Sequence, residues 1–293
     1  MNPNMSRRYW FILLILLTSC TQEIHTDAAL PVVTSVVATE TPILPTPIPA
    51  SPTPVFFPSQ ALASGPINII AIGDDLTRGD GDDLGRGYPG RLLELVSQIR
   101  PGSTVINFAQ SGWTSDDVIH GDGDFSGQLE RAVGETQSAI SQKRASVALV
   151  WIGGNDLWEL YSGEEPVAPA DEDNDAERFA RNMDAILFAL RDAGAEVIVA
   201  KLDDQSLRPA RTRSETYPSI TADELQRMSA QARRYNAIVE RKAAAYNALI
   251  VDFYGMDLFT DQDTLSDDGM HPNPAGYELI AQAWYKALIP ILP

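Results

Sequence analysis

From residue 67 to the end of the chain, short apolar runs alternate with longer amphipathic stretches. The short runs are continuously apolar, as is typical of strands covered on both faces of a sheet. They occupy residues 67–73 (INIIAIG), 104–109 (TVINFA), 146–153 (SVALVWIG), 196–202 (EVIVAKL) and 249–254 (LIVDFY). Five strands that alternate with helices predict a parallel sheet with helices on both sides, which is an α/β fold.

The amphipathic stretches carry apolar residues at steps of three and four, the spacing of a helix with one buried face. Three of them are marked by Tyr88, Leu92, Val96 and Ile99; by Phe179, Met183, Ile186 and Leu190; and by Leu225, Met228, Ala232 and Tyr235. Thr221 and Glu224 have the spacing of a capping box, and Asn273 followed by Pro274 fits a helix cap and first helical residue. This last cap predicts a final helix that runs to about residue 292.

The first residues of the chain have the features of an export signal. Arg7 and Arg8 precede the apolar run 9–17, which is as long as a secretory signal core and shorter than the roughly 20 residues of a membrane span. The run ends in LTSC, which resembles the lipobox of bacterial lipoproteins, where the cysteine is acylated and becomes the new N-terminus. Cys20 is the only cysteine of the chain. We therefore expect removal of residues 1–19 and a lipid anchor on the extracytoplasmic side of the bacterial membrane; the alternative is an ordinary signal peptide with an incidental cysteine.

Residues 20–66 form a segment rich in proline and threonine, with nine of the chain's twenty prolines. Such a segment favours extended polyproline II structure, so we expect a stalk that holds one domain, residues 67–293, away from the membrane. Because residues 1–19 contain two arginines and no acid, their removal takes the formal net charge from -18 to -20. This charge excludes nucleic acid as a partner and leaves the lipid anchor as the means of membrane attachment.

Four short motifs lie at the ends of predicted strands or just before the last helix. They are GDDLT (73–77), NFAQSG (107–112), GGND (153–156) and DGMHPN (268–273). In parallel sheets ligands bind beyond the carboxyl ends of the strands, so these motifs are expected to meet. Together and in this order they resemble the four blocks of the SGNH/GDSL hydrolase superfamily, over nearly all of residues 67–293. The resemblance implies a three-layer α/β/α, flavodoxin-like fold with a five-stranded parallel sheet.

The resemblance also implies a catalytic triad and an oxyanion hole. His271 would be the general base and Asp268 would orient it, while the residue at position 75, the Gly112 N–H and the Asn155 amide would form the oxyanion hole. The chemistry agrees, because an acid three residues before a histidine in a tight loop can accept the Nδ1 proton and leave Nε2 facing the cleft. A backbone N–H paired with an amide donor suits a developing oxyanion.

The first motif departs from the family, because Asp75 stands where the family has its nucleophilic serine. Asp74 matches the family's aspartate, which has a local hydrogen-bonding role. Carboxylates act as nucleophiles in some enzymes, but on an ester the intermediate must expel either a carboxylate, whose conjugate acid has a pKa of about 4, or a far more basic alkoxide. Collapse to reactants is therefore favoured.

Asp75 is also expected to disable the base. With Asp75 on one side and Asp268 on the other, His271 is expected to favour the imidazolium, which cannot accept a proton. The oxyanion donors could bind Asp75 itself. Loss of a triad serine costs about a million-fold in turnover, although residual catalysis over water can remain.

Three functions remain open from the sequence. The first is an ester hydrolase scaffold, for acyl or acetyl esters of lipid or carbohydrate, whose hydrolysis is impaired by Asp75. The second is a cell-surface binding protein for acylated ligands that has given up turnover. The third is a hydrolase that uses Asp75 as a nucleophile on a substrate with a better leaving group.

No cofactor or metal is expected. The acidic stretch that begins at residue 171 lacks the sixth-position glycine of an EF-hand loop and has Asn182 in place of the twelfth-position glutamate, so the acidic clusters are interpreted as solvated loops. Trp113 and Trp151 flank the motifs and could line a cleft, although Trp151 fits the core equally well.

Overall fold

The structure is a computed structural model that describes residues 57–58, 62–123, 125–163, 165–212 and 220–292. The expected signal peptide, the lipidation site at Cys20 and nearly all of the proline-rich stalk lie outside the described residues. Among the described helices, none combines the length and the apolar character that a bilayer crossing requires.

The described residues contain one five-stranded parallel sheet, with the strands in the order β2-β1-β3-β4-β5. The strands are β1 (Ile67–Gly73), β2 (Thr104–Asn107), β3 (Ala145–Trp151), β4 (Glu196–Lys201) and β5 (Leu249–Asp252). This order is that of flavodoxin-like doubly wound sheets. The predicted fold class and the five parallel strands are confirmed.

The two edge strands correct one expectation from the apolar pattern. Strands β2 and β5 have four residues each and are only partly buried, so the prediction that all five strands are covered on both faces is wrong for them. β2 ends two residues before the apolar run does, because the Asn107 side chain accepts a hydrogen bond from the Ala109 N–H (3.0 Å) and donates one to the Thr77 carbonyl (2.8 Å). The central strands β1 and β3 are buried along nearly their whole length.

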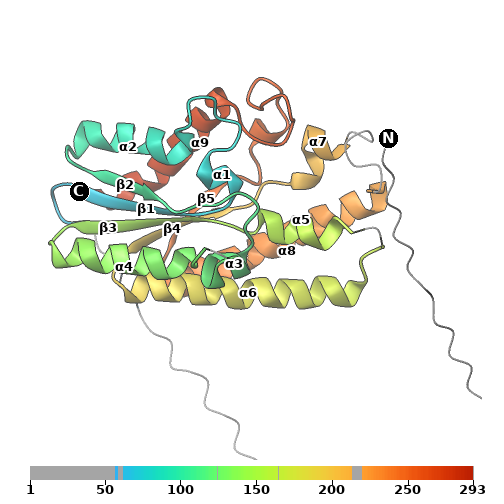
Figure 1. The fold of residues 1–293 in the computed structure, drawn as a ribbon, viewed down its shortest axis with the longest axis horizontal. Coiled ribbons are helices and arrows are strands. Elements are labelled where there is room, and N and C mark those ends of the chain that lie inside the picture. The colour runs from blue at the N-terminus through green and yellow to red at the C-terminus, as the bar shows by residue number, and fades with distance from the viewer. Residues whose placement is uncertain (1–56, 59–61, 124, 164, 213–219, 293) are drawn as a thin grey trace, which may run out of the picture. The chain divides into compact units, whose positions relative to one another are not determined.

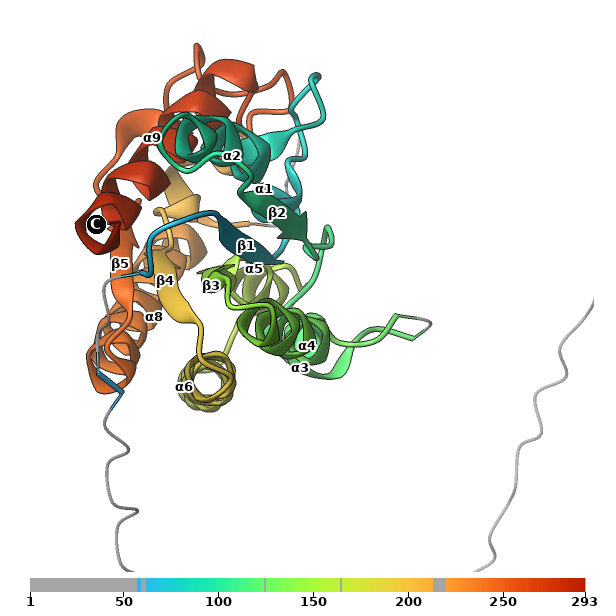
Figure 2. The ribbon, with the colours of Figure 1, turned by 90° about the vertical axis from the view of Figure 1, so that its left-hand side faces the viewer.

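Helices cover both faces of the sheet, which makes three layers (Figure 1). One face carries α2 (Gly87–Ile99) and α9 (Pro274–Leu288), and the other carries α4 (Gln128–Ser141), α6 (Pro169–Asp192) and α8 (Ala222–Tyr246). Figure 2 shows the same layers from the end at which the strands begin. Shorter helices follow the strands: α1 (Asp75–Arg78), α3 (Ser115–His120), α5 (Gly154–Tyr161) and α7 (Pro209–Thr212). Single 3₁₀ turns occupy Gln205–Leu207, Asp257–Phe259 and Ile289–Ile291.

Both predicted helix caps are present. The Thr221 hydroxyl accepts from the Glu224 N–H (3.2 Å), and the Glu224 carboxylate accepts from the Thr221 N–H (2.8 Å). The Asn273 side chain caps α9, which begins at Pro274. However, α9 ends at Leu288, before the predicted position 292, because Pro290 has no N–H to continue the helix.

Aromatic side chains fill the layer between the sheet and the α2/α9 pair. Trp151 is 1% exposed, and its ring stacks on Phe253 with 4.3 Å between centroids. Tyr88 and Trp284 stack beside it at 5.1 Å. Buried aromatic rings contribute large apolar areas and favour stacked or edge-on contacts. Trp151 is therefore a core residue, and of its two sequence interpretations the cleft-lining one is not supported.

The chain joins the sheet from the end opposite the strand termini that carry the motifs. Leu62 is buried and its N–H donates to the Ile291 carbonyl (2.9 Å). The Arg100 guanidinium donates to the Ala63 and Gly65 carbonyls (2.8 and 2.9 Å). These contacts fix the approach of the chain to the first residues of β1.

Candidate active site

The first motif turns directly from strand to helix. Gly73 ends β1 opposite Trp151 of β3, with a φ of 155°. A Cβ at Gly73 would lie 2.1 Å from the Trp151 carbonyl oxygen and 2.5 Å from the Thr77 hydroxyl. Only glycine fits this close approach, and it allows α1 to begin at the carboxyl end of the strand.

The two adjacent carboxylates have different surroundings. The Asp74 side chain caps α1 by accepting from the Leu76 N–H (3.2 Å) and is 2% exposed. Burial raises the pKa of Asp74 well above its usual value, and the neighbouring charge of Asp75 raises it further. Both effects shift Asp74 towards its neutral acid form, and its side chain occupies the local structural position that the sequence suggested.

Asp75 lies between the imidazole and the amide of the later motifs. Its Oδ2 is 3.3 Å from Nε2 of His271, and its Oδ1 accepts from Nδ2 of Asn155 (2.9 Å). On the other side of the ring, Nδ1 of His271 is 2.6 Å from Oδ2 of Asp268. The four side chains thus form a continuous chain of contacts, with the carboxylate of Asp75 in the position of the family's serine.

The loop before α9 holds the histidine in place. Oδ1 of Asp268 accepts from the backbone N–H groups of Met270 (2.7 Å) and His271 (3.0 Å) and from the Ser266 hydroxyl (2.8 Å). One carboxylate therefore orders the loop with one oxygen and orients the ring with the other.

The pKa values of the three groups follow from these contacts. Burial alone would raise the pKa of Asp75, but hydrogen bonds from His271 and Asn155 outweigh it and hold this pKa well below its usual range. Burial likewise opposes the ionisation of Asp268, yet the same histidine and the backbone N–H groups lower its pKa to about 2. For His271, burial favours the neutral ring, and the two carboxylates outweigh it and raise the pKa. The arrangement favours an imidazolium between two carboxylates.

The expected oxyanion donors are only partly assembled. Besides Asp75, the Asn155 amide donates to the Trp113 carbonyl (3.1 Å), so both of its N–H bonds are engaged. Gly112, with a φ of 78°, lies in the same loop, one residue before Trp113. No hydrogen bond joins Gly112 to Asp75 among the described residues, and its oxyanion role stays a prediction.

A small cavity beside Asp75 contains residues that the motifs did not reveal. It measures about 170 Å³ and is lined by Asp74, Asp75, Leu76, Gly154, Asn155, Trp158, Gln205, Arg208, Arg211, Met270 and His271. Arg208 is buried, pairs with both carboxylate oxygens of Asp203 (2.7 Å each) and donates to the Met270 carbonyl (3.1 Å). The one sequence feature that could have pointed to Arg208 is its place in the segment DDQSLRPAR (203–211), which follows β4 at the edge of the sheet where the motifs lie.

A second buried acid steadies the neighbouring loop. Asp156 is fully buried and accepts from the Ser115 N–H (2.8 Å) and hydroxyl (2.5 Å). Burial raises the pKa of Asp156 to about 6, although these hydrogen bonds oppose the shift. Asp156 therefore ties the start of α3 to α5, next to the contact between Asn155 and Trp113.

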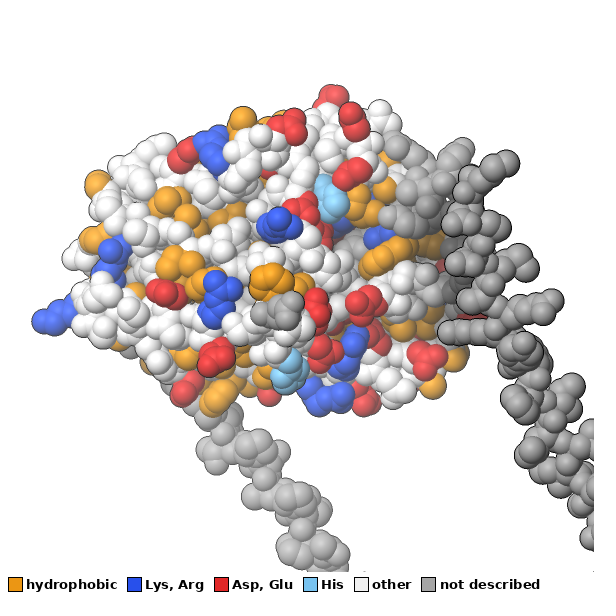
Figure 3. Space-filling view, in the orientation of Figure 1, with side chains coloured by type: hydrophobic (Ala, Val, Ile, Leu, Met, Phe, Trp, Pro, Cys, Tyr) orange, Lys and Arg blue, Asp and Glu red, His pale blue; other side chains and the backbone are white. Residues whose placement is uncertain are grey.

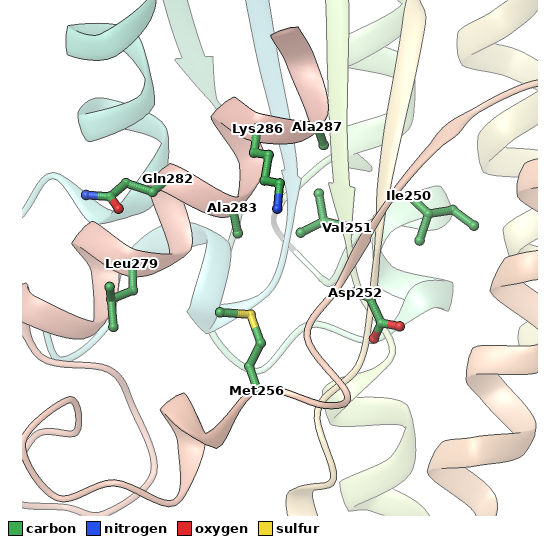
Figure 4. A pocket seen from close by; sticks show the side chains of 9 residues that line it. All are labelled: Ile250, Val251, Asp252, Met256, Leu279, Gln282, Ala283, Lys286 and Ala287. Carbon is green, nitrogen blue, oxygen red and sulfur yellow. The ribbon is translucent and has the colours of Figure 1, made fainter. Parts of the chain in front are cut away.

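Acidic side chains gather at this end of the domain, on the right of the face in Figure 3. Within the described ranges, no three histidine, cysteine, aspartate or glutamate side chains are grouped so that they could hold a metal ion. A separate groove of about 590 Å³ lies between β5 and α9 (Figure 4) and is lined by Ile250, Val251, Met256, Leu279, Lys286 and their neighbours. None of the four motifs contributes to this groove.

Comparisons with known proteins agree with the geometry. The GDSL-like Lipase/Acylhydrolase family matches residues 71–279. The chain is 28% identical over 232 residues to the uncharacterized protein YpmR of Bacillus subtilis (strain 168), with 76% of this chain and 81% of YpmR covered.

Solved structures share the fold. The crystal structure of TesA matches with a TM-score of 0.52 and 19% identity, over 77% of this chain and 99% of that one. The psychrotrophic esterase EstA from Pseudoalteromonas sp. matches with a TM-score of 0.52 and 17% identity, over 76% and 97%. The family match spans more than half of the sequence, and this chain therefore belongs to the GDSL-like lipase/acylhydrolase family of the SGNH/GDSL superfamily.

Proposed function

We propose that the domain binds acyl or acetyl esters of lipid or carbohydrate on an SGNH hydrolase scaffold whose ester hydrolysis is severely weakened by Asp75. One observation carries the proposal: the Asp75 carboxylate is held by the His271 imidazole and the Asn155 amide at 3.3 and 2.9 Å. These are the groups that the family uses as the base and as an oxyanion donor. The Asp75 carboxylate is therefore an anion that the protein itself places on these two groups.

Ester hydrolysis therefore lacks both a general base and a free oxyanion donor. An imidazole that favours its protonated form cannot remove a proton from a nucleophile. An amide that already donates to a carboxylate cannot stabilise a developing oxyanion without first giving up that bond. Ligand binding needs neither step, so the cavity of about 170 Å³ beside Asp75 remains available to a ligand.

The same contacts argue against Asp75 as a working nucleophile. Its pKa is held well below the usual range by two hydrogen bonds, and a more stable carboxylate attacks carbon more weakly. Each oxygen also holds one hydrogen-bonding partner, which stabilises the free carboxylate further. Nucleophilic catalysis by Asp75 therefore has less support than impaired hydrolysis or ligand binding.

The test compares p-nitrophenyl acetate hydrolysis by the wild type and by Asp75→Ser. The wild type should stay near the uncatalysed rate, and Asp75→Ser should exceed it by at least about 100-fold, because a full triad serine is worth about a million-fold. The matched control is the double variant Asp75→Ser/His271→Ala, which should return to the background rate. Substantial and equal hydrolysis by the wild type and Asp75→Ser would refute the proposal.

We also propose that the domain is attached to the extracytoplasmic face of a bacterial membrane by a lipid on Cys20. The lipobox-like LTSC sequence supports this proposal. In a bacterial host, Cys20→Ala should move the chain from the membrane fraction to the soluble fraction. An unchanged distribution would rule out the lipid as the anchor.

A further inference from the structure

Two buried side chains that line the cavity beside Asp75 carry polar atoms without a hydrogen-bond partner among the described residues. Asp74 is 2% exposed and Gln205 is 4% exposed, and both line the cavity. Among the described residues, only Oδ1 of Asp74 has a recorded side-chain contact, and the amide group of Gln205 has none. Both groups line the cavity, so a ligand that enters it can pair with them.

Gly154 shows that both side chains face the same small space. A Cβ built on Gly154 would lie 2.7 Å from Nε2 of Gln205 and 3.2 Å from Oδ2 of Asp74. Gly154 is the first residue of α5, and its φ is not in the left-handed region. The absence of a side chain at this position therefore keeps the space open, although the backbone itself would accept alanine.

Size and charge limit what the space can hold. At about 170 Å³, the cavity is close to the engineered cavity of about 150 Å³ that holds benzene. A cation would meet Arg208 and Arg211 in the lining, and an anion would meet Asp75. Trp158 and Met270 supply apolar surface. A small neutral group with both polar and apolar parts suits this lining best.

We propose that Asp74 and Gln205 form a subsite for an amide group, such as the acetamido group of an N-acetylated sugar. Nε2 of Gln205 and the protonated Oδ2 of Asp74 would both donate to the amide carbonyl oxygen, which has two lone pairs, and the methyl group would pack on Trp158. This inference rests on the proposed function, because it names the ligand class that the ester-binding cleft takes. Burial raises the pKa of Asp74, which agrees with a neutral acid that donates.

The test is a ligand-observed NMR titration of the wild-type chain with N-acetylglucosamine, and with glucose as the sugar that lacks the amide. N-acetylglucosamine should bind saturably and glucose at least about tenfold more weakly. Gln205→Leu should weaken N-acetylglucosamine binding by about tenfold, the effect of one lost hydrogen bond. Gln137→Leu is the matched control, because Gln137 is exposed on α4, and it should bind as the wild type does.

Gly154→Ala is the second variant and keeps both polar side chains. Its methyl group occupies the shared space, so Gly154→Ala should abolish binding, and it decides the question if Gln205→Leu does not fold. Equal binding of the two sugars, no binding to the wild type, or wild-type binding by Gly154→Ala would each overturn the subsite. The hydrolysis of p-nitrophenyl acetate by Asp75→Ser does not use an amide, so failure of the subsite and failure of the proposed function are told apart.

Discussion

The contact between Asp75 and His271 predicts how the histidine titrates. The substitution is Asp75→Asn, which removes one negative charge and keeps the shape of the side chain. The oxygen of the new side chain could still accept from Asn155, and its amide could donate to a neutral imidazole. The expected result is a lower pKa for His271, because the protonated ring loses one of its two anionic neighbours.

The magnitude follows from the separation of the charged atoms. At 3.3 Å between Nε2 and Oδ2, two unit charges attract by about 5 kcal/mol at an effective dielectric constant of about 20. One pKa unit corresponds to about 1.4 kcal/mol, which sets an upper limit of about 3 to 4 units. The two side chains are 24% and 16% exposed, so solvent screens part of the attraction. We expect the pKa of His271 to fall by about 1 to 2 units.

The assay is NMR detection of the imidazole Cε1–H resonance as a function of pH, with the signal of His271 assigned from His271→Gln. Asp252→Asn is the matched control, because Asp252 ends the edge strand β5 and pairs with Lys201 of β4 instead of with the site. It should leave the midpoint unchanged. An identical His271 midpoint in the wild type and in Asp75→Asn would show that the two side chains do not interact in solution, and would remove the electrostatic basis of the proposed function.

The pairing of Asp75 with His271 also makes the free energy of unfolding depend on pH. The raised pKa of His271 contributes stability that is complete below its unfolded value of about 6.5 and is lost as the pH rises through the folded value. The lowered pKa of Asp75 contributes stability above about 4 that is lost as the pH falls. The pair therefore stabilises the fold most between about pH 4 and 6.5, and Asp75→Asn should remove this contribution.

Two further predictions concern buried charges near the site. Because the pKa of Asp156 is raised to about 6, its contribution to the free energy of unfolding should decline by up to about 3 kcal/mol between about pH 4 and 6; urea titrations should show this slope in the wild type and not in Asp156→Asn. Arg208→Met leaves Asp203 buried and unpaired and should cost about 3–5 kcal/mol in the same assay, whereas Asp203→Leu/Arg208→Met should regain much of the loss. A double variant as unstable as Arg208→Met would contradict this account.

The sheet and the helix caps were predictable because their signals are local. The apolar runs of β1 and β3 and the capping box at Thr221 need only neighbouring residues to be recognised. The edge strands were predicted too long and too buried, because an apolar run does not reveal which strands have a neighbour on one side only. The end of α9 was predicted too late, because the apolar residues around Pro290 continue the helical pattern past the proline that ends it.

The site was predictable where family motifs carry it and not elsewhere. The alignment of Asp268, His271 and Asp75 follows from the order of the motifs at the strand ends. Gln205 and Arg208 belong to no motif, and their place beside Asp75 depends on how the segment after β4 turns back towards the loop before α9. The hydrogen bond from the Ala210 N–H to the Gly269 carbonyl (3.0 Å) is part of that turn and has no sequence signal.

Asp75 determines which part of the cleft is free to form new hydrogen bonds with a ligand. In an active hydrolase the base and the oxyanion donors await the substrate, so their pairing stabilises the transition state. Here Asp75 pairs with both His271 and Asn155 in the free protein, and a ligand that reached them would have to displace a carboxylate. By contrast, the Gln205 amide and one oxygen of Asp74 line the cavity and have no protein hydrogen-bond partner in the described part of the chain. If the proposed subsite is correct, a ligand therefore forms its new hydrogen bonds on the Gln205 side of the cleft and leaves the contacts of Asp75 in place.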